Sequence, residues 1–170
     1  MPSTDDVFQL ELREVAYSHP HAVTLTDLAQ TYYRDIYGAP DSSPMPGDDF
    51  VPPRGALFVG YVAADPVAMG GWRWHSVIEG WPSQRPAELR RMFVHPDQRG
   101  RGFARTLLAA LEGSARDAGA DATVLETGFV QVDAVGLYRA SGYVDMPRFG
   151  HYAAEEGSLH HLGKLLRSDS

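Results

Sequence analysis

The pattern of apolar and polar positions divides the first third of the chain into a strand, a helix and a loop. Residues 8–15 alternate between apolar and polar side chains, which predicts a half-buried strand. Residues 25–37 carry apolar side chains at helical intervals, and Gly38 followed by Pro40 is typical of a helix end. Residues 39–54 are rich in Pro, Ser, Asp and Gly without periodicity, so we expect a loop there.

The rest of the chain alternates short apolar segments with helical patterns. Segments 56–63 and 67–75 flank Ala64-Asp65-Pro66, which favours a hairpin. The elements expected after them are strands over 87–94, 122–127 and 159–166, a strand beginning at 143, and helices over 101–118 and 133–141. An antiparallel first half followed by a βαβ-like second half predicts an α/β (α+β) protein with a mixed sheet. No repeat or interdomain linker interrupts this order, so we expect a single domain over residues 1–170.

The composition excludes several kinds of chemistry. The 170 residues include no cysteine, so disulfides, thiolate metal sites and a cysteine acyl-enzyme are impossible. No apolar run approaches the roughly 18 residues that span a bilayer, and the first residues lack the pattern of a signal peptide. We therefore expect a cytoplasmic protein with no membrane partner. The formal net charge of −7 disfavours a nucleic-acid partner.

The most informative stretch is the turn between the strand at 87–94 and the helix that follows. Pro96 and Asp97 end the strand, and Gly100 and Gly102 let the backbone bend tightly next to a ligand. At the start of the helix, free backbone N–H groups and the helix dipole favour a phosphate or pyrophosphate. Positive charge is added by Arg99, Arg101 and Arg105. Neither the three-glycine dinucleotide fingerprint nor the Lys-Ser/Thr pair of the nucleotide P-loop is present.

The motif Arg99-Gly100-Arg101-Gly102-Phe103-Ala104 resembles the Gln/Arg-x-x-Gly-x-Gly/Ala signature of the GCN5-related N-acetyltransferases, the GNAT superfamily. A strand ending in Val-x-Pro before the motif and a Leu-rich helix after it fit the same family. The element order also resembles the GNAT acyl-CoA N-acyltransferase fold, in which two central parallel strands splay apart between flanking helices. Here those strands would be residues 87–94 and 122–127, with the pantetheine arm of acetyl-coenzyme A (acetyl-CoA) in the gap. The resemblance implies acetyl-CoA as co-substrate and no metal.

The resemblance assigns two sets of residues to acetyl-CoA. The first set ends the strand, where backbone groups would meet the pantetheine and the acetyl carbonyl: Met92, Phe93 and Val94. The second set forms the turn that would hold the pyrophosphate: Arg99, Gly100, Arg101, Gly102, Phe103, Ala104 and Arg105. The alternatives are ordinary core packing for the first set and an exposed basic turn for the second.

Tyr138 is the candidate general acid. It lies in Leu137-Tyr138-Arg139-Ala140-Ser141-Gly142-Tyr143, which is similar to the family's helix in which a tyrosine hydroxyl faces the coenzyme sulfur. The departing thiolate needs a proton, and a phenol with a pKa of about 10 is well matched to a thiol of similar basicity. The alternative is a core tyrosine with a bound hydroxyl, which is our interpretation of Tyr143.

Glu88 is the candidate general base for the acceptor amine. It precedes Met92 at an even offset, so a regular strand would place both on one face. Some family members carry a glutamate base at this offset, while many use no dedicated base. A structural ion pair with Arg85 or Arg90 is an equally weighted alternative. Glu126, at the end of the facing strand, is the second candidate.

The remaining candidate residues concern the acceptor and metals. Gln131 and Asp133 open the short helix at 133–141, where Asp133 is expected as the N-cap. His75, His95, His151, His160 and His161 lack the i, i+4 spacing of a zinc motif, so we expect no metal. The acceptor pocket is expected to be lined by Tyr32, Tyr33, the 38–54 loop, Trp72 or Trp74, and residues 151–161.

These features favour an N-acetyltransferase that transfers the acetyl group directly to a primary amine of a small molecule. Two alternatives remain open from the sequence. One is a protein acetyltransferase acting on a lysine or an N-terminus, and the other is a non-catalytic acyl-CoA-binding sensor. A homodimer also stays open, because many members of the family are dimers.

Overall fold

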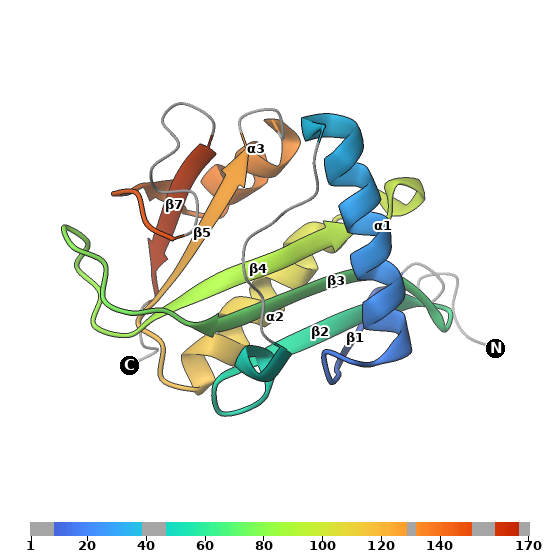
Figure 1. The fold of residues 1–170 in the computed structure, drawn as a ribbon, viewed down its shortest axis with the longest axis horizontal. Coiled ribbons are helices and arrows are strands. Elements are labelled where there is room, and N and C mark those ends of the chain that lie inside the picture. Colours follow the sequence, from blue (N-terminus) through green and yellow to red (C-terminus); the bar gives the residue numbers. More distant parts are fainter. Residues whose placement is uncertain (1–8, 39–46, 129–131, 151–158, 167–170) are drawn as a thin grey trace.

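The protein forms one mixed β-sheet covered by helices on both faces (Figure 1). The computed structural model describes residues 9–38, 47–128, 132–150 and 159–166. Within them, the sheet has the strand order β1-β2-β3-β4-β5-β7-β6. The strands are β1 (Glu11–Glu14), β2 (Gly55–Val62), β3 (Asp65–Trp74), β4 (Pro86–Val94), β5 (Ala122–Gly128), β6 (Val144–Asp145) and β7 (Leu159–Leu165). Neighbouring strands are antiparallel, except for the central pair β4 and β5. The predicted mixed-sheet fold is confirmed.

The helices are α1 (Pro20–Tyr37), α2 (Phe103–Asp117) and α3 (Val132–Ala140), with short 3-10 turns η2 (Gly47–Phe50) and η3 (Pro96–Gln98). In Figure 1, α1 crosses in front of the sheet and α2 lies behind it. Two larger apolar clusters occupy these faces. One lies between α2 and the sheet, with Leu107, Leu111 and Trp72 among its members, and the other lies beneath α1, with Leu25, Val59 and Phe93.

Helix α1 begins five residues earlier than the apolar pattern predicted. Pro20 occupies the first turn, where its missing N–H costs no helical hydrogen bond. The ring nitrogen Nδ1 of His19 accepts from the backbone N–H of His21 at 3.1 Å, so His19 caps the helix. The end at Gly38 is as predicted, since this glycine adopts φ +75° and its N–H donates to the carbonyl of Arg34. Of the expected loop, residues 39–46 lie outside the described residues, and residues 47–50 form η2.

The central parallel strands separate soon after they begin. The β4–β5 register covers only Pro86–Glu88 against Ala122–Val124. On its other edge, β4 continues to pair with β3 as far as Val94. Among the described residues, 89–94 therefore have no strand partner on the β5 side, which leaves backbone hydrogen-bonding groups of β4 facing a gap. This confirms the predicted splay.

A β-bulge in β4 sets which side chains face each helix. Met69 pairs with Phe93 and Gly71 pairs with Arg90, so two β4 residues lie opposite Gly70. Arg91 adopts φ +57° at this point. The extra residue in the bulge reverses the alternation of β4 side chains. Two β4 residues an even number of positions apart, one on each side of the bulge, therefore point to opposite faces of the sheet.

The reversed alternation corrects the predicted position of Glu88. Met92 packs against the cluster beneath α2, while Phe93 packs in the cluster beneath α1. Glu88 faces the α1 side, where Arg73 reaches it. Glu88 and Met92 thus lie on opposite faces, and the prediction that they share one was wrong because sequence spacing does not reveal the bulge.

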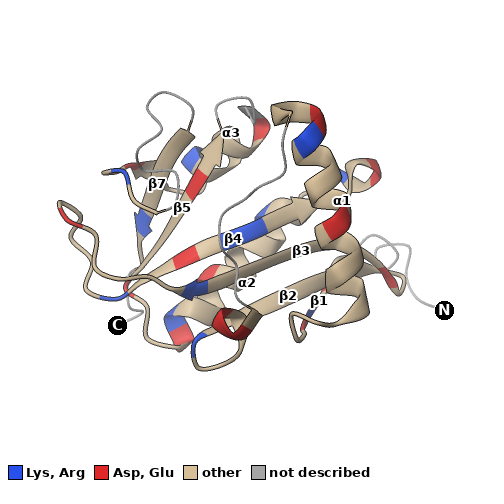
Figure 2. Cartoon of the chain, in the orientation of Figure 1, with Lys and Arg blue, Asp and Glu red and all other residues tan. Residues whose placement is uncertain are grey.

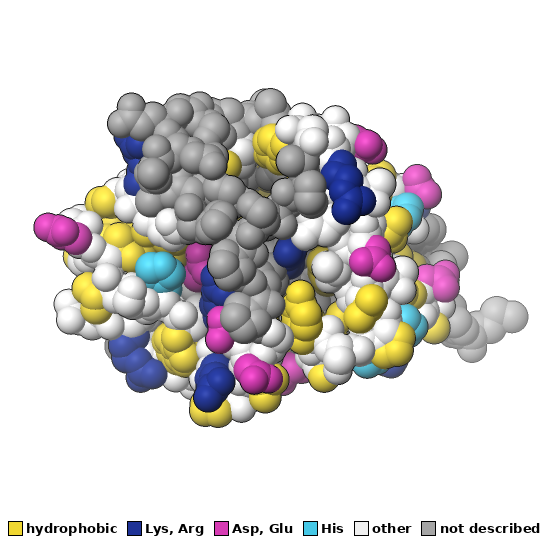
Figure 3. Space-filling model, viewed as in Figure 1, with side chains coloured by type: hydrophobic (Ala, Val, Ile, Leu, Met, Phe, Trp, Pro, Cys, Tyr) yellow, Lys and Arg dark blue, Asp and Glu magenta, His cyan; other side chains and the backbone are white. Residues whose placement is uncertain are grey.

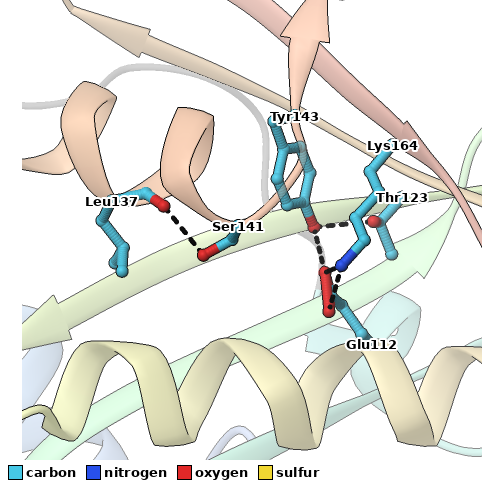
Figure 4. A network of polar contacts seen from close by, with 6 residues as sticks. All are labelled: Glu112, Thr123, Leu137, Ser141, Tyr143 and Lys164. Atoms are coloured by element: carbon cyan, nitrogen blue, oxygen red, sulfur yellow. Dashed lines mark hydrogen bonds and ion pairs between the residues drawn. The ribbon is translucent and has the colours of Figure 1, made fainter.

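A buried polar network joins the second half of the fold (Figure 4). The hydroxyl of Tyr143 lies 2.7 Å from Thr123 Oγ1 and donates to Glu112 Oε2 at 2.9 Å. Lys164 Nζ donates to both carboxylate oxygens of Glu112 at 3.1 and 3.2 Å. Burial and the neighbouring Glu112 raise the pKa of Tyr143, so its hydroxyl stays protonated. The network ties α2 to β5 and β7, which supports the structural interpretation of Tyr143.

Candidate active site

The bend after β4 exposes the N-terminus of α2. Gly100 and Gly102 both adopt φ +79°, a conformation that disfavours residues with a Cβ. Gly102 is the N-cap residue, and no side chain caps the helix. The first-turn N–H groups of an α-helix have no partner inside the helix, so here they are available to an anion. A Cβ added at either glycine would meet no protein atom within 4 Å, so the space before the bend is open.

The three arginines of the bend do not act as one group. Arg101 and Arg105 are exposed beside the helix start, and Arg101 Nη1 donates to Gln98 Oε1 at 2.9 Å. The guanidinium of Arg99 instead lies 4.7 Å above the ring of Tyr32 on α1. Its Nε donates to the carbonyl of Val94 at 3.2 Å. Arg99 therefore links the end of β4 to α1. From the sequence, we expected its positive charge to lie around the bend.

The other residues assigned to the bend and to the end of β4 have distinct environments. Phe103 is buried beneath α2 and anchors the first turn, while Ala104 is half-buried. Phe93 is buried against Tyr32, with ring centroids 6.2 Å apart. Val94 is buried on the α2 side, and Met92 is half-buried there. The core-packing interpretation of these side chains is correct, and the interpretation of their backbone as a pantetheine edge is compatible with it.

Tyr138 lies at the gap between the splayed strands. Its hydroxyl donates to the sulfur of Met92 at 3.4 Å, which brings α3 to the open end of β4. Its ring packs edge-on against Tyr143. Burial raises the pKa of Tyr138, with a smaller contribution from Tyr33, so the phenol keeps its proton at neutral pH. In the described part of the chain its partner is a thioether, which is a weak acceptor, so the protonated hydroxyl is able to donate to a stronger one.

Tyrosine side chains of α1 lie over the same gap, on the opposite face of the sheet from Tyr138. Tyr32 packs on Phe93 of β4, and the hydroxyl of Tyr37 touches the position where Gly128 of β5 would carry a Cβ. Burial raises the pKa of Tyr37 to about 12, with smaller contributions from Tyr33 and Tyr32. Tyr32 and Tyr33 were expected on the acceptor side. Tyr37 was not, because only the packing of α1 brings it to β5.

Comparison with known proteins identifies this arrangement. The family model described as "Acetyltransferase (GNAT) family" matches residues 22–143, which include the bend, both splayed strands and Tyr138. The chain belongs to the GNAT acetyltransferase family. Its match to an IAA acetyltransferase of Azospirillum brasilense is 44% identical over 72 residues, 42% of this chain and 47% of that protein. Its match to N-acetyltransferase family 8 member 2 of Rattus norvegicus is 33% identical, covering 62% of this chain and 41% of that protein.

Solved structures of GNAT relatives share the whole fold. A Klebsiella pneumoniae protein named as a candidate acyl-CoA N-acyltransferase superposes with a TM-score of 0.75 at 23% identity, covering 94% of this chain and 99% of that one. A GNAT acetyltransferase of Elizabethkingia anophelis with acetyl-CoA bound has a TM-score of 0.64 at 14% identity, covering 92% and 98%. At these identities the likeness concerns the fold alone. The chain spans about half or less of the two curated relatives that it matches.

On the α1 face of this GNAT fold, Glu88 is held by an arginine. Arg73, its cross-strand neighbour on β3, donates from Nε to Glu88 Oε1 at 2.9 Å and from Nη1 to Asp49 Oδ2 at 3.2 Å. The Glu88 side chain is 2% exposed. Arg73 is not one of the two arginines considered from the sequence, Arg85 and Arg90. The contact is nevertheless a structural ion pair, which was the alternative to a role for Glu88 as base. Figure 2 shows acidic and basic positions side by side along β4.

A second buried carboxylate, Glu126, lies on β5 and faces His161 on β7 at 3.3 Å. Both side chains are almost fully buried, and neither oxygen of Glu126 has a hydrogen-bond partner among the residues that the structure describes. Nothing in the local sequence pattern joins these two residues, because β5 and β7 meet only in the folded sheet.

The remaining predicted residues are less closely tied to the gap. Asp133 lies inside the first turn of α3, which begins at Val132, so it is not the N-cap. Trp72 faces α2 and donates from Nε1 to Ser114 at 2.9 Å, so it does not line an acceptor pocket on the α1 face. Trp74 does border a hollow of about 370 Å³, together with Asp49, Arg54, Arg73, His75 and Ser76. Gln131 and His151 lie outside the described residues.

Within the described residues, no helix is both long and apolar enough to cross a bilayer. In the same part of the chain, no three His, Asp or Glu side chains gather as metal ligands would. Acidic and basic side chains are interspersed on the face seen in Figure 3.

Proposed function

We propose that this protein is an acetyl-CoA-dependent N-acetyltransferase that transfers the acetyl group directly to a primary amine of a small molecule. The observation that carries the proposal is the gap between β4 and β5, which opens after Glu88 and leads to the uncapped N-terminus of α2. A narrow arm with amide groups fits an edge of unpaired backbone, and a diphosphate fits the helix start. The acetyl-CoA-bound GNAT relative supports this choice of co-substrate.

The residues of the gap would divide the work. The N–H groups at the start of α2, with Arg101 and Arg105, would bind the diphosphate. The backbone of Met92–Val94 would orient the arm, because only that edge of β4 lacks a strand partner. Acetyl-CoA held there would supply the acetyl group as a thioester. Direct transfer is the simplest route, since the chain has no cysteine thiol that could carry the acetyl group as an enzyme intermediate.

Tyr138 would serve as general acid. Its phenol is protonated and buried, and its hydroxyl donates to Met92 Sδ at the open end of β4. A leaving thiolate is a far stronger acceptor than a thioether, so the proton would pass to it. Glu88 is a weaker candidate for the base, because Arg73 already occupies its carboxylate and an acceptor ammonium would have to compete with that guanidinium.

The test is a thiol-release assay of the purified protein with acetyl-CoA across a library of small amines and lysine peptides. We expect heat on titration with coenzyme A and release of thiol with at least one small amine. Release only with peptides would favour the protein acetyltransferase instead. Binding without release for any acceptor would favour the sensor, and no binding at all would overturn the proposal.

A further inference from the structure

The C-terminal end of α3 fixes one tyrosine against another. Gly142 adopts φ +96° and donates its N–H to the carbonyl of Arg139 at 3.2 Å, and the N–H of Tyr143 donates to the carbonyl of Tyr138 at 3.0 Å. These two bonds form a Schellman motif, which commonly brings the side chains of its first and last residues into contact. Here the rings of Tyr138 and Tyr143 pack edge-on, with centroids 5.6 Å apart. The local chain geometry therefore makes the position of Tyr138 depend on that of Tyr143.

The other contacts of Tyr138 and its helix are weaker. Of the α3 side chains that the structure describes, at 133–140, that of Tyr138 is buried and the rest are half-buried or exposed. The hydroxyl of Tyr138 donates to the sulfur of Met92, which is a weak acceptor. The ion pair between Arg139 and Asp145 at 3.0 Å is exposed, so it contributes little. The packing against Tyr143 is thus the main constraint on where the Tyr138 ring lies.

Tyr143, in contrast, is anchored at the far end of its side chain (Figure 4). It is buried, and its hydroxyl donates to Glu112 Oε2 at 2.9 Å. Because a phenol has one proton, the hydroxyl of Thr123, 2.7 Å away, donates to the phenolic oxygen. Lys164 Nζ donates to both oxygens of Glu112 and holds the carboxylate in place. The Tyr143 hydroxyl therefore has both a fixed acceptor and a fixed donor.

The residues that anchor Tyr143 come from the elements that form the gap. Thr123 lies on β5 opposite Ala87 of β4, in the short stretch where these two strands still pair. Lys164 is directly opposite Thr123 in the β5–β7 register, and Glu112 lies on α2, the helix that follows the bend. Met92 lies farther along β4, where the strands have separated. The network therefore places Tyr143, and through it Tyr138, relative to the paired base of the two strands.

We propose that Tyr143 is a positioning residue, whose anchored hydroxyl holds Tyr138 where its phenol reaches the leaving sulfur. This inference rests on the proposed acetyltransferase function, with Tyr138 as the acid. Proton transfer requires hydrogen-bond reach between donor and acceptor, and a misplacement of about 1 Å can cost on the order of 10²-fold in rate. The hydroxyl of Tyr143 is engaged by Glu112 and Thr123, so it acts through Tyr138 rather than on the substrate itself.

The first test is Tyr143→Phe, which keeps the ring that packs on Tyr138 and removes the anchoring hydroxyl. We expect kcat to fall about 10- to 10²-fold. KM for both substrates and the calorimetric affinity for acetyl-CoA should stay as in the wild type, because the bend that would hold the diphosphate is unchanged. Stability should also fall, so each variant is assayed well below its melting temperature. The matched control is Arg139→Gln, which removes the exposed ion pair at the same end of α3 and should leave kcat unchanged.

The decisive comparison repeats Tyr143→Phe in a Tyr138→Phe background. There the proton donor is already gone, so adding Tyr143→Phe should leave kcat unchanged. A merely structural role would instead lower kcat by the same factor in both backgrounds. Equal factors, or a single Tyr143→Phe variant with the kcat of the wild type, would overturn the inference.

Thr123→Val weakens the same anchor without altering Tyr143, and it decides the question if Tyr143→Phe does not fold. Since the bond to Glu112 remains, we expect a smaller fall in kcat than for Tyr143→Phe, and again no fall in the Tyr138→Phe background. The same fall in both backgrounds, or none in either, would contradict the inference while leaving the acetyltransferase function intact. A wild type that neither binds acetyl-CoA nor releases thiol would overturn the proposed function, and this inference with it.

Discussion

The hydroxyl of Tyr138 donates to the sulfur of Met92 across 3.4 Å, joining α3 to the open end of β4. This contact matters because a thioether is a weak acceptor, so the hydroxyl, which burial keeps protonated, can exchange it for a stronger hydrogen bond to an expelled thiolate. We expect Tyr138→Phe to lower kcat by about 10²- to 10⁴-fold, because the phenyl ring keeps the packing but removes the proton donor. Calorimetry should give unchanged affinity for acetyl-CoA. A variant with wild-type kcat would exclude Tyr138 as the acid.

The bend requires glycine for its conformation rather than for lack of space. Gly102 has φ +79° and open surroundings, so Gly102→Ala should cost about 1–2 kcal/mol of stability and place a methyl group before the anion site. Acetyl-CoA should bind more weakly. The matched control is Gly113→Ala in the middle of α2, where nothing lies within 4 Å of a new Cβ.

Gly113→Ala should stabilise the protein by up to about 1 kcal/mol through helix propensity and leave binding unchanged. Thermal melting and calorimetry measure both quantities. Equal binding by the two variants would contradict a diphosphate site at the bend.

The arginines of the bend should separate into two classes. Arg101→Gln and Arg105→Gln should each weaken acetyl-CoA binding about tenfold, with a smaller effect at high salt, because each removes a charge beside the helix start. Arg99→Gln should instead lower stability, because Arg99 packs on Tyr32 and donates to Val94. Titrations at two salt concentrations distinguish the classes. Salt-independent losses would argue against phosphate contacts.

Asp121 clamps the two parallel strands at the end where they still pair. Burial alone would raise its pKa, but hydrogen bonds from Ser83 Oγ and from the backbone N–H groups of Gln84 and Arg85 outweigh burial and lower it. Because the folded-state pKa lies below the unfolded value of about 3.9, its stabilisation is full above that pH. The stabilisation is lost as the pH falls through the folded-state pKa.

We expect Asp121→Ala to destabilise the protein by about 1–3 kcal/mol at pH 7. The difference from wild type should shrink in acid, because the carboxyl of the unfolded state gains its proton below about pH 3.9 while that of the folded state still resists protonation. Denaturant unfolding at pH 7 and pH 3 checks both expectations. A difference that stays constant between these pH values would show that the charge of Asp121 contributes nothing.

Much of the fold and the bend could be predicted from the sequence because the signals are local. The strand at 56–63 was found at Gly55–Val62 and the helix at 101–118 at Phe103–Asp117. The positive φ angles of Gly100 and Gly102 follow from the same short motif that predicted the turn. The predicted helix began at Leu25, so the two signals for its true start, Pro20 in the first turn and the His19 cap, were missed.

By itself, the sequence determined the order of elements, the glycine bend before α2 and the absence of any cysteine nucleophile, because periodicity, turn residues and composition act over neighbouring positions. Only the tertiary structure decided that Glu88 and Met92 lie on opposite faces of the sheet, since the bulge in β4 reverses the side chains that follow it. It alone turned Arg99 toward Tyr32 and brought Glu126 opposite His161. Those contacts join residues far apart in the chain, and packing across the sheet rather than local propensity selects them.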